Sequence, residues 1–309
     1  LTDSGLSITK WDLFTGIFPP LSLDDWKKSF SLYKKIPEYK LINPTMTLDQ
    51  FKFIYWWEYV HRLLGRAIGL LFMLPLIYLT FKKKLSKKNL FSLYFILFLM
   101  LFQGFVGWYM VKSGLVDRTD VSQYRLSLHL TLAIIIFCLL FWNFLKNVNQ
   151  NNFDSNIKIS FYLPVIFLII LILQISLGGF VSGLDAGQIY QSWPLMNQGY
   201  FPADSMFSDL FSLKVFETPS IVQFIHRNVA YIMLVFFLVI LFIVFKNDDL
   251  AYLRKSAISV FLLLLLQLFL GILTIIFGAQ ILFASMHQLG SIVLLTATLI
   301  LVFKNSRIN

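Results

Sequence analysis

The chain changes from polar to apolar at Glu58-Tyr59-Val60-His61-Arg62. This stretch brings a carboxylate, an imidazole and a guanidinium together directly before the first long apolar run. Ionisable side chains at the edge of a membrane span are costly, and they commonly have a function. A second stretch, Gln223-Phe224-Ile225-His226-Arg227, opens a later apolar run in the same way. The repetition predicts a duplicated membrane protein with paired metal or haem sites.

The composition is that of a membrane protein. Of the 309 residues, 58% are hydrophobic and only 14% are charged, and the mean hydropathy is +0.73. A soluble domain of this size could not cover so much apolar surface with polar groups. The net charge of +10 fits Lys and Arg in cytoplasmic loops, so we expect no nucleic-acid partner. The single cysteine, Cys138, excludes a disulfide within the chain and a cysteine-ligated metal.

Seven apolar runs follow, each near the roughly 20 residues that a helix needs to cross the hydrocarbon core. They cover approximately residues 63–81, 90–111, 126–145, 159–182, 222–245, 257–278 and 281–303. The runs predict an all-α polytopic membrane protein.

The charges of the loops predict the orientation. The lysine-rich loop of residues 82–88 should be cytoplasmic. Alternation then places the basic segments 146–158, 246–256 and 304–309 on the same side, and residues 1–57 and 183–221 outside. Because a chain that begins outside needs an earlier span, we expect one further helix before Leu1, and eight in total.

The two halves of the chain repeat the same motifs, which predicts two four-helix bundles in parallel orientation. The matching pairs are His61-Arg62 with His226-Arg227, Phe102-Gln103-Gly104 with Phe269-Leu270-Gly271, and Leu128-His129 with Met286-His287. The predicted parts are an outer segment (1–57), an N-terminal half-bundle (58–145), a cytoplasmic linker (146–158) and a C-terminal four-helix bundle (159–309).

Two helix-capping signatures lie in the outer segment. Ser22-Leu23-Asp24-Asp25 predicts a short amphipathic helix on the membrane surface. Thr47-Leu48-Asp49-Gln50 predicts the start of a helix that continues through Glu58 and His61 into the bilayer.

All four histidines lie near the outer ends of predicted spans, two in each half: His61, His129, His226 and His287. Two neutral imidazoles that face each other suit the axial positions of haem iron, and the core of a helix bundle accepts a flat cofactor. The pairs lack the further Cys, Asp or Glu of a typical zinc site. The alternative for each histidine is a hydrogen bond between helices.

Arg62 and Arg227 each follow a histidine, and their guanidinium groups could bind the anionic propionates of a haem. Arg66 and Arg125 are further candidates. The alternative for each of these arginines is that the side chain extends to the lipid headgroups.

Glu58 breaks the symmetry between the halves. It lies three residues before His61 on the same helix face, whereas its counterpart, Gln223, cannot ionise. A single acid in a duplicated protein indicates that the first half carries out chemistry and that the second half only holds a haem. The alternative is that Glu58 is an interfacial carboxylate paired with Arg62.

Together, six stretches resemble the haem A synthase family, in its alphaproteobacterial and mitochondrial branch. They are LTDSGLSITKWDLFTG, EYVHRLLGRAIGL, QYRLSLHLTLA, GGFVSGLDAGQIYQSWPLMN, QFIHRNVAYI and ASMHQLGSIVLL. The resemblance covers essentially the whole chain. The cysteine pair that other branches carry in the first outer loop is absent here, so a thiol step of that kind is excluded.

The resemblance implies a role for each candidate residue. His61 and His129 would ligate the substrate haem, His226 and His287 would ligate a resident haem b, and Glu58 would be the acid that the reaction needs. The implied reaction oxidises a porphyrin methyl of haem O to the formyl group of haem A, by successive hydroxylations with water as the oxygen source. The product would serve cytochrome oxidase biogenesis.

The same resemblance implies the partners and the location. Haem O synthase would donate the substrate, membrane lipids would surround the helices, and an unidentified acceptor would take the electrons. The location would be the inner (cytoplasmic) membrane of a cell, or the mitochondrial inner membrane in a eukaryote. The sequence leaves open whether the chain forms a homo-oligomer.

Two other functions also use histidines in membrane helices. A membrane di-haem cytochrome b, which passes electrons between quinol and an acceptor, would need the same histidine pairs but not Glu58 in one half alone. A transporter with a proton relay would place its polar groups near mid-membrane, whereas the ionisable residues here gather at the outer edge.

Overall fold

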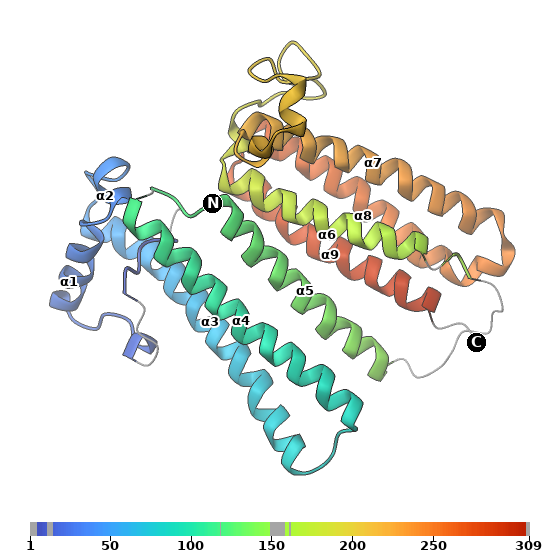
Figure 1. Cartoon of the computed structure of the whole chain (residues 1–309), viewed down its shortest axis with the longest axis horizontal. Helices are drawn as coiled ribbons and strands as arrows, with labels where there is room; N and C mark the ends of the chain where they lie inside the picture. The colour runs from blue at the N-terminus through green and yellow to red at the C-terminus, as the bar shows by residue number, and fades with distance from the viewer. Residues whose placement is uncertain (1–4, 11–14, 118, 149–157, 161, 307–309) are drawn as a thin grey trace. The chain divides into compact units, whose positions relative to one another are not determined.

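The computed structural model describes residues 5–10, 15–117, 119–148, 158–160 and 162–306. These residues are almost entirely helical, and they contain no β-strand (Figure 1). The short elements are η1 (Thr15–Ile17), α1 (Leu23–Tyr33), α2 (Pro37–Leu41), η2 (Ala186–Gln188), η3 (Phe207–Phe211), η4 (Leu213–Phe216) and η5 (Asp248–Leu250). The predicted all-α fold is therefore confirmed.

Seven helices in the described part of the chain are long and apolar enough to cross a membrane. They are α3 (Leu48–Phe81), α4 (Lys87–Asp117), α5 (Gln123–Val148), α6 (Tyr162–Gly183), α7 (Pro219–Lys246), α8 (Ala251–Ile276) and α9 (Ile281–Ser306). Each contains most of one predicted apolar run, so the seven predicted spans are confirmed. The further helix expected before Leu1 stays a prediction.

The long helices expose large apolar side chains along much of their length. Leu71 is 74% exposed, Phe91 is 78% exposed and Phe81 is 83% exposed. A contiguous apolar surface of this extent is stable against lipid but not against water. The chain is therefore a multi-pass membrane protein.

The segment before α3 folds as an aromatic cap on the first turns of that helix. The second capping signature is confirmed, because Gln50 N donates to Thr47 Oγ1 (3.3 Å) and Thr47 N donates to Gln50 Oε1 (2.8 Å). Phe51 is fully buried and stacks on Phe30 of α1, with ring centroids 5.0 Å apart. Aromatic packing of this kind explains why α3 begins well before its apolar run.

Helix α1 begins directly after Ser22, as its capping signature predicts. The hydrogen bonds from Ser22 hold the pKa of the Asp25 carboxyl below its usual value. The expected position of α1 on the membrane surface stays a prediction, but its aromatic face packs on protein. Phe30 and Tyr33 on that face are buried against Phe51, so they are not available to lipid.

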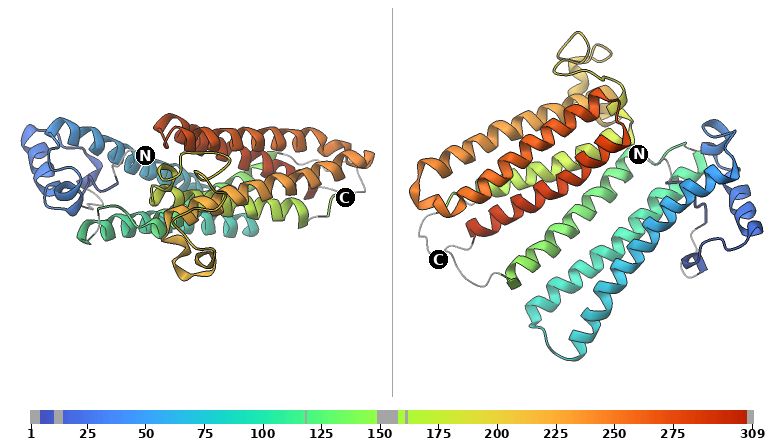
Figure 2. Two further views of the ribbon diagram at one scale, coloured as in Figure 1. Left: turned by 90° about the horizontal axis from the view of Figure 1, so that it is seen from above. Right: turned by 180° about the vertical axis from the view of Figure 1, so that it is seen from behind.

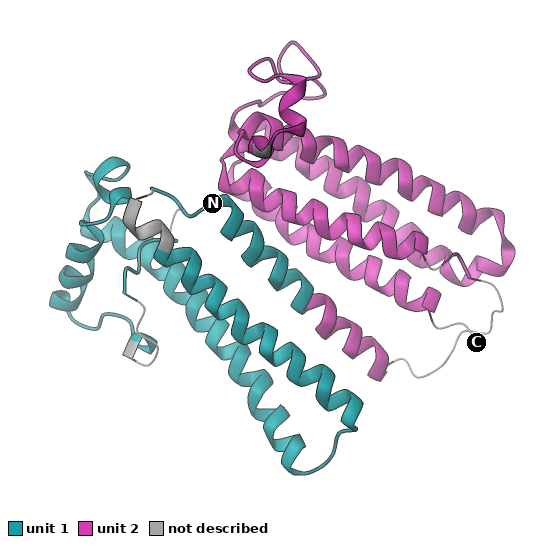
Figure 3. Ribbon diagram, viewed as in Figure 1, with its two compact units in different colours: residues 1–136 teal, residues 137–309 magenta. Residues whose placement is uncertain are grey.

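The chain divides into two compact units, residues 1–136 and 137–309, with the boundary inside α5 (Figure 3). In the second unit, α6 packs against α7 and α9, and α8 also packs against both. Helices α7 and α9 therefore lie at opposite corners of a four-helix bundle, which Figure 2 shows from two further directions. The division into four parts expected from the sequence stays a prediction.

The orientation in the membrane can be tested with accessible cysteines. Ser86, in the turn before α4, and Ser208, in the loop before α7, are both exposed. Single cysteines at these positions, in a Cys138→Ala background, are expected to react with an impermeant thiol reagent from opposite sides, with Ser86→Cys reacting from the cytoplasm. Reaction of both from one side would contradict the orientation and, with it, the outer position of the histidines.

Candidate functional site

In the first unit, the structure brings the rings of His61 of α3 and His129 of α5 close together, in a T-shaped arrangement. Their ring centroids are 6.4 Å apart and their planes lie at 66°. His129 lies near the start of its helix. His61 lies much further along its own helix, because α3 begins at Leu48 in the aromatic cap. The predicted pairing of these two histidines within one half is therefore present in the structure.

In the second unit, His226 of α7 and His287 of α9 form an equivalent pair. Their ring centroids are also 6.4 Å apart, and their planes lie at 75°. Because α7 and α9 occupy opposite corners of the bundle, the two rings meet across its core. The structure thus gives both pairs the same spacing, although α5, α7 and α9 carry their histidines near their first residues and α3 does not.

The spacing fits two axial ligands of one iron. Each bond from a metal to an imidazole nitrogen is about 2 Å long, and each nitrogen lies about 1 Å from its ring centre, so two trans ligands have centroids roughly 6 Å apart. Nδ1 is buried without a hydrogen-bond partner in His129, His226 and His287, so no protein group occupies that nitrogen in these rings. Among the described residues, no group of three or more His, Cys, Asp or Glu could hold a metal ion. The histidine pairs therefore suit a haem better than a bare metal ion.

Glu58 is 6% exposed and ties α3 to the segment near the N-terminus. Its Oε2 accepts hydrogen bonds from Ser7 Oγ (2.6 Å) and from Ile8 N (2.8 Å). Its Oε1 is paired with Arg62, and Arg62 Nη2 also donates to Ile8 O (3.1 Å). A carboxylate has about four acceptor positions, and these donors take three of them. We call this set, Ser7, Ile8, Glu58 and Arg62, the Glu58 clamp.

The second unit repeats the clamp with different chemistry. Gln223 Nε2 donates to Tyr190 O (3.2 Å), and Arg227 Nη2 donates to the same carbonyl (2.9 Å) and to Gln223 Oε1 (3.3 Å). Arg227 Nη1 also reaches Leu195 O (3.4 Å). Here the segment between α6 and α7 presents the carbonyl oxygen of Tyr190, which accepts hydrogen bonds. The amide of Gln223 can donate to it, whereas the carboxylate of Glu58 can only accept. The difference in function predicted from Glu58 stays a prediction, and the structure shows a difference in hydrogen bonding at this position.

The structure gives each predicted arginine a protein partner. Arg62 binds the backbone of Ile8, and Arg227 binds the backbone of Tyr190 and Leu195. Arg66 Nη1 donates to Gly16 O (3.1 Å), and Arg125 Nη2 lies 3.3 Å from Tyr109 Oη. Arg227 Nε is buried without a hydrogen-bond partner. The binding of haem propionates by Arg62 and Arg227 stays a prediction.

One part of the sequence repeat was aligned wrongly. Gly104 has no neighbouring atom within 4 Å of the position of an added Cβ, whereas a Cβ on Gly107 would lie 3.0 Å from Cε1 of His129. A Cβ on Gly271 would lie 3.2 Å from Cε1 of His287. The counterpart of Gly271 is therefore Gly107 and not Gly104, and the repeated unit is Gln-x-x-x-Gly. The sequence comparison missed this motif because it aligned Phe102 with Phe269, which shifts the two glutamines out of register.

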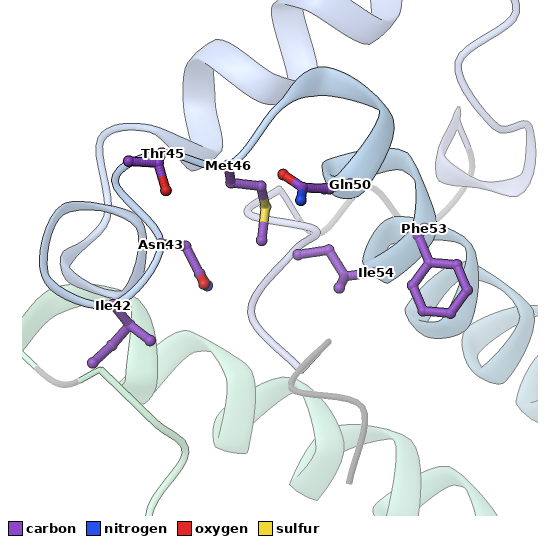
Figure 4. A pocket seen from close by; sticks show the side chains of 7 residues that line it. All are labelled: Ile42, Asn43, Thr45, Met46, Gln50, Phe53 and Ile54. Atoms are coloured by element: carbon purple, nitrogen blue, oxygen red, sulfur yellow. The ribbon is translucent and has the colours of Figure 1, made fainter.

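A pocket in the aromatic cap is a weaker candidate for the functional site. It lies between the end of α2 and the first turns of α3, and its lining side chains are polar or apolar without a titratable or metal-binding group (Figure 4). They are Ile42, Asn43, Thr45, Met46, Gln50, Phe53 and Ile54. The histidine pairs and the Glu58 clamp are thus the better candidates for the functional site.

An all-helical membrane protein with paired histidines in its helix bundle has the site geometry expected of a membrane haem protein. The comparison with known proteins identifies the family. A family model described as cytochrome oxidase assembly protein matches residues 1–299, so the chain belongs to that family.

Several relatives are similar over nearly the whole chain. The heme A synthase of Pelagibacter ubique is 50% identical over 309 residues, which are 99% of this chain and 90% of the relative. The heme A synthase of Rickettsia bellii is 44% identical, covering 97% of this chain and 89% of the relative. The heme A synthase of Rhizobium etli is 40% identical, and the match covers 95% of this chain and 80% of the relative. These findings confirm the resemblance seen in the sequence, including its alphaproteobacterial branch.

Proposed function

We propose that the chain is a haem A synthase, which oxidises a porphyrin methyl of haem O to the formyl group of haem A. One observation carries this proposal: two histidine pairs have the same centroid distance of 6.4 Å, but only one pair has a buried carboxylate on an adjoining turn of its helix. An electron carrier with two equal haems does not need this difference.

The two pairs have different tasks in this proposal. His61 and His129 hold the substrate haem, and the protein presents its methyl edge to Glu58. His226 and His287 hold a resident haem b, which supplies an electron carrier when it is bound. The support for this division is the clamp chemistry, because a group that can accept a proton is present beside His61 and is replaced by the amide of Gln223 beside His226.

Glu58 acts as the proton acceptor in the proposed reaction. Each hydroxylation adds the oxygen of one water molecule to the methyl carbon and releases two protons and two electrons. After the second hydroxylation, the geminal diol loses water and leaves the formyl group. Glu58 takes a proton from the attacking water, while Arg62 and the backbone of Ile8 keep the carboxylate oriented. The electrons pass to an acceptor outside this chain.

The surroundings follow from the same proposal. The substrate arrives from haem O synthase, the helices lie in the inner membrane of a bacterial cell, and the product serves cytochrome oxidase. The two units each supply a histidine pair from within this chain, so neither pair requires a homo-oligomer.

The proposal is tested by the pigments that the protein binds. We expect the full chain, purified from membranes that make haem O, to carry haem b together with haem O or haem A, in about equal amounts. Extraction with acidified acetone and chromatography against haem standards measures this composition. Haem b alone at both sites would favour a di-haem cytochrome b, and protein that binds no haem would favour a transporter.

A further inference from the structure

We propose that three Gln-x-x-x-Gly motifs position the haem-ligating histidines, and we call each motif a seat. The motif occurs at three places in the sequence: Gln103–Gly107, Gln174–Gly178 and Gln267–Gly271. They lie on α4, α6 and α8, and each of these helices directly precedes a helix that carries a histidine. The inference rests on the proposed function in one respect, namely that the histidine pairs hold haem.

The glycine of each seat lies against the edge of an imidazole ring. The position of an added Cβ is 3.0 Å from Cε1 of the ring at Gly107, 3.2 Å at Gly271 and 3.6 Å at Gly178. The corresponding rings are those of His129, His287 and His226. A contact near 3 Å is shorter than an ordinary carbon–carbon contact, so a methyl group does not fit at Gly107 or Gly271 with the rings where they are. The helix backbone cannot yield, and therefore the ring would have to move.

The glutamine of the seat holds the backbone of the histidine. Gln103 Nε2 donates to His129 O (2.9 Å), and Gln174 Nε2 donates to His226 O (2.8 Å). Both bonds join neighbouring helices across an apolar environment, where a polar group has few other partners. Each bond therefore fixes the height of one helix against the next, and with it the height of the ring.

The third seat uses the same residues in a different way. Gln267 is 6% exposed, and both polar atoms of its amide are buried without a hydrogen-bond partner. The amide fills the space beside Gly290 of α9, where an added Cβ would lie 2.0 Å from Nε2. Gly290 is one turn after His287. Gln267 therefore also positions the helix turn that carries the histidine, but it does so by steric packing and not by a hydrogen bond to the histidine carbonyl.

The seats restrict three of the four histidine rings, one in the first pair and both in the second. A ring whose edge rests on a glycine, and whose backbone is held by a glutamine, has little freedom to approach or leave its partner. Because the axial ligands set the spin state and reduction potential of haem iron, the glycine of a seat should control the spectrum of one haem. Gln103, Gln174 and the three glycines are positioning residues in this view.

A graded alanine series tests the proposal. Gly107→Ala is expected to weaken haem binding in the first unit about tenfold or more, or to shift its low-spin spectrum. Gly271→Ala should do the same to haem b in the second unit. Gly178→Ala should have a small effect, because 3.6 Å is an ordinary contact. Gly104→Ala is the matched control on the same helix, and it should leave both haems unchanged.

The readouts are electron paramagnetic resonance, redox titration and haem content of the full chain. In each variant, the haem of the other unit reports whether the protein is folded. Gln103→Leu should shift the potential of the first-unit haem alone. Equal spectra for the Gly107→Ala and Gly104→Ala variants, each with full haem content, would contradict the proposal that the seats position the histidines. A wild-type protein without haem would instead overturn the proposed function.

Discussion

Replacing Glu58 by glutamine is expected to lower haem A formation by about 10²–10⁴-fold, the usual loss when a general base is removed. Both haems should stay bound, because the ligands of both sites remain. Haem O or a partly oxidised product should accumulate on the protein. Haem A formed per unit time and the bound pigments measure the two effects separately. A well-folded Glu58→Gln variant with near-normal haem A formation would remove Glu58 from the mechanism.

The Glu58 clamp makes a control necessary. An amide can accept from Ser7 and Ile8 on its oxygen side, but its nitrogen then faces Arg62, which is also a donor. The substitution therefore removes a base and also disturbs the clamp. Ser7→Ala removes one donor and keeps the carboxylate, and its cost is that of a single hydrogen bond to a charged group, about 1.5–3 kcal/mol in stability. We expect this variant to retain most of its activity.

Comparison of the two variants separates chemistry from structure. If Glu58 only anchors the outer segment, the Ser7→Ala and Glu58→Gln variants should lose stability and haem together, and Arg62→Gln should resemble them. If Glu58 is the proton acceptor, only Glu58→Gln combines full haem content with a large loss of rate. Glu58→Asp should recover part of the activity if the carboxylate can still reach the substrate.

Replacing one histidine by alanine is expected to empty one site and leave the other filled. His226→Ala or His287→Ala should lose haem b, because in the proposed function each ring of this closely spaced pair would supply one ligand to its iron. His61→Ala or His129→Ala should retain haem b but abolish conversion of haem O. Pigment analysis and the absorption spectrum of each purified variant measure these outcomes.

The two pairs provide controls for each other. Both members of a pair should give the same phenotype, since their ring centroids are equally spaced in the two units. Loss of the same haem in all four variants would contradict the assignment of two sites. Retention of both haems in any one variant would show that the histidine replaced is not a ligand.

Much of the molecule is determined locally, and these parts could be predicted from the sequence. The seven spans follow from apolar runs, because a helix in lipid must satisfy its own backbone hydrogen bonds. The starts of α1 and α3 follow from Ser22 and Thr47, because a capping box needs only residues a turn apart. The pairing of histidines within each half followed from the repeat of His61 and His226 along the chain.

The remaining features were decided by contacts between distant segments. The sequence does not show that Glu58 binds Ser7 and Ile8, because hydrogen bonds across about fifty residues depend on how the outer segment folds back. Likewise, the aromatic face of α1 could have met lipid or protein, and only the packing against Phe51 decided it.

The apolar runs and the positions of the histidines are enough to predict which helices cross the membrane and which of them carry histidines. The tertiary structure decided that Gly107, and not Gly104, lies under a histidine ring. Both glycines lie on α4 a turn apart, and the apolar pattern around them is uniform. The rotation of a helix about its axis is set by close contact with its neighbours, so the choice between them required the packed structure.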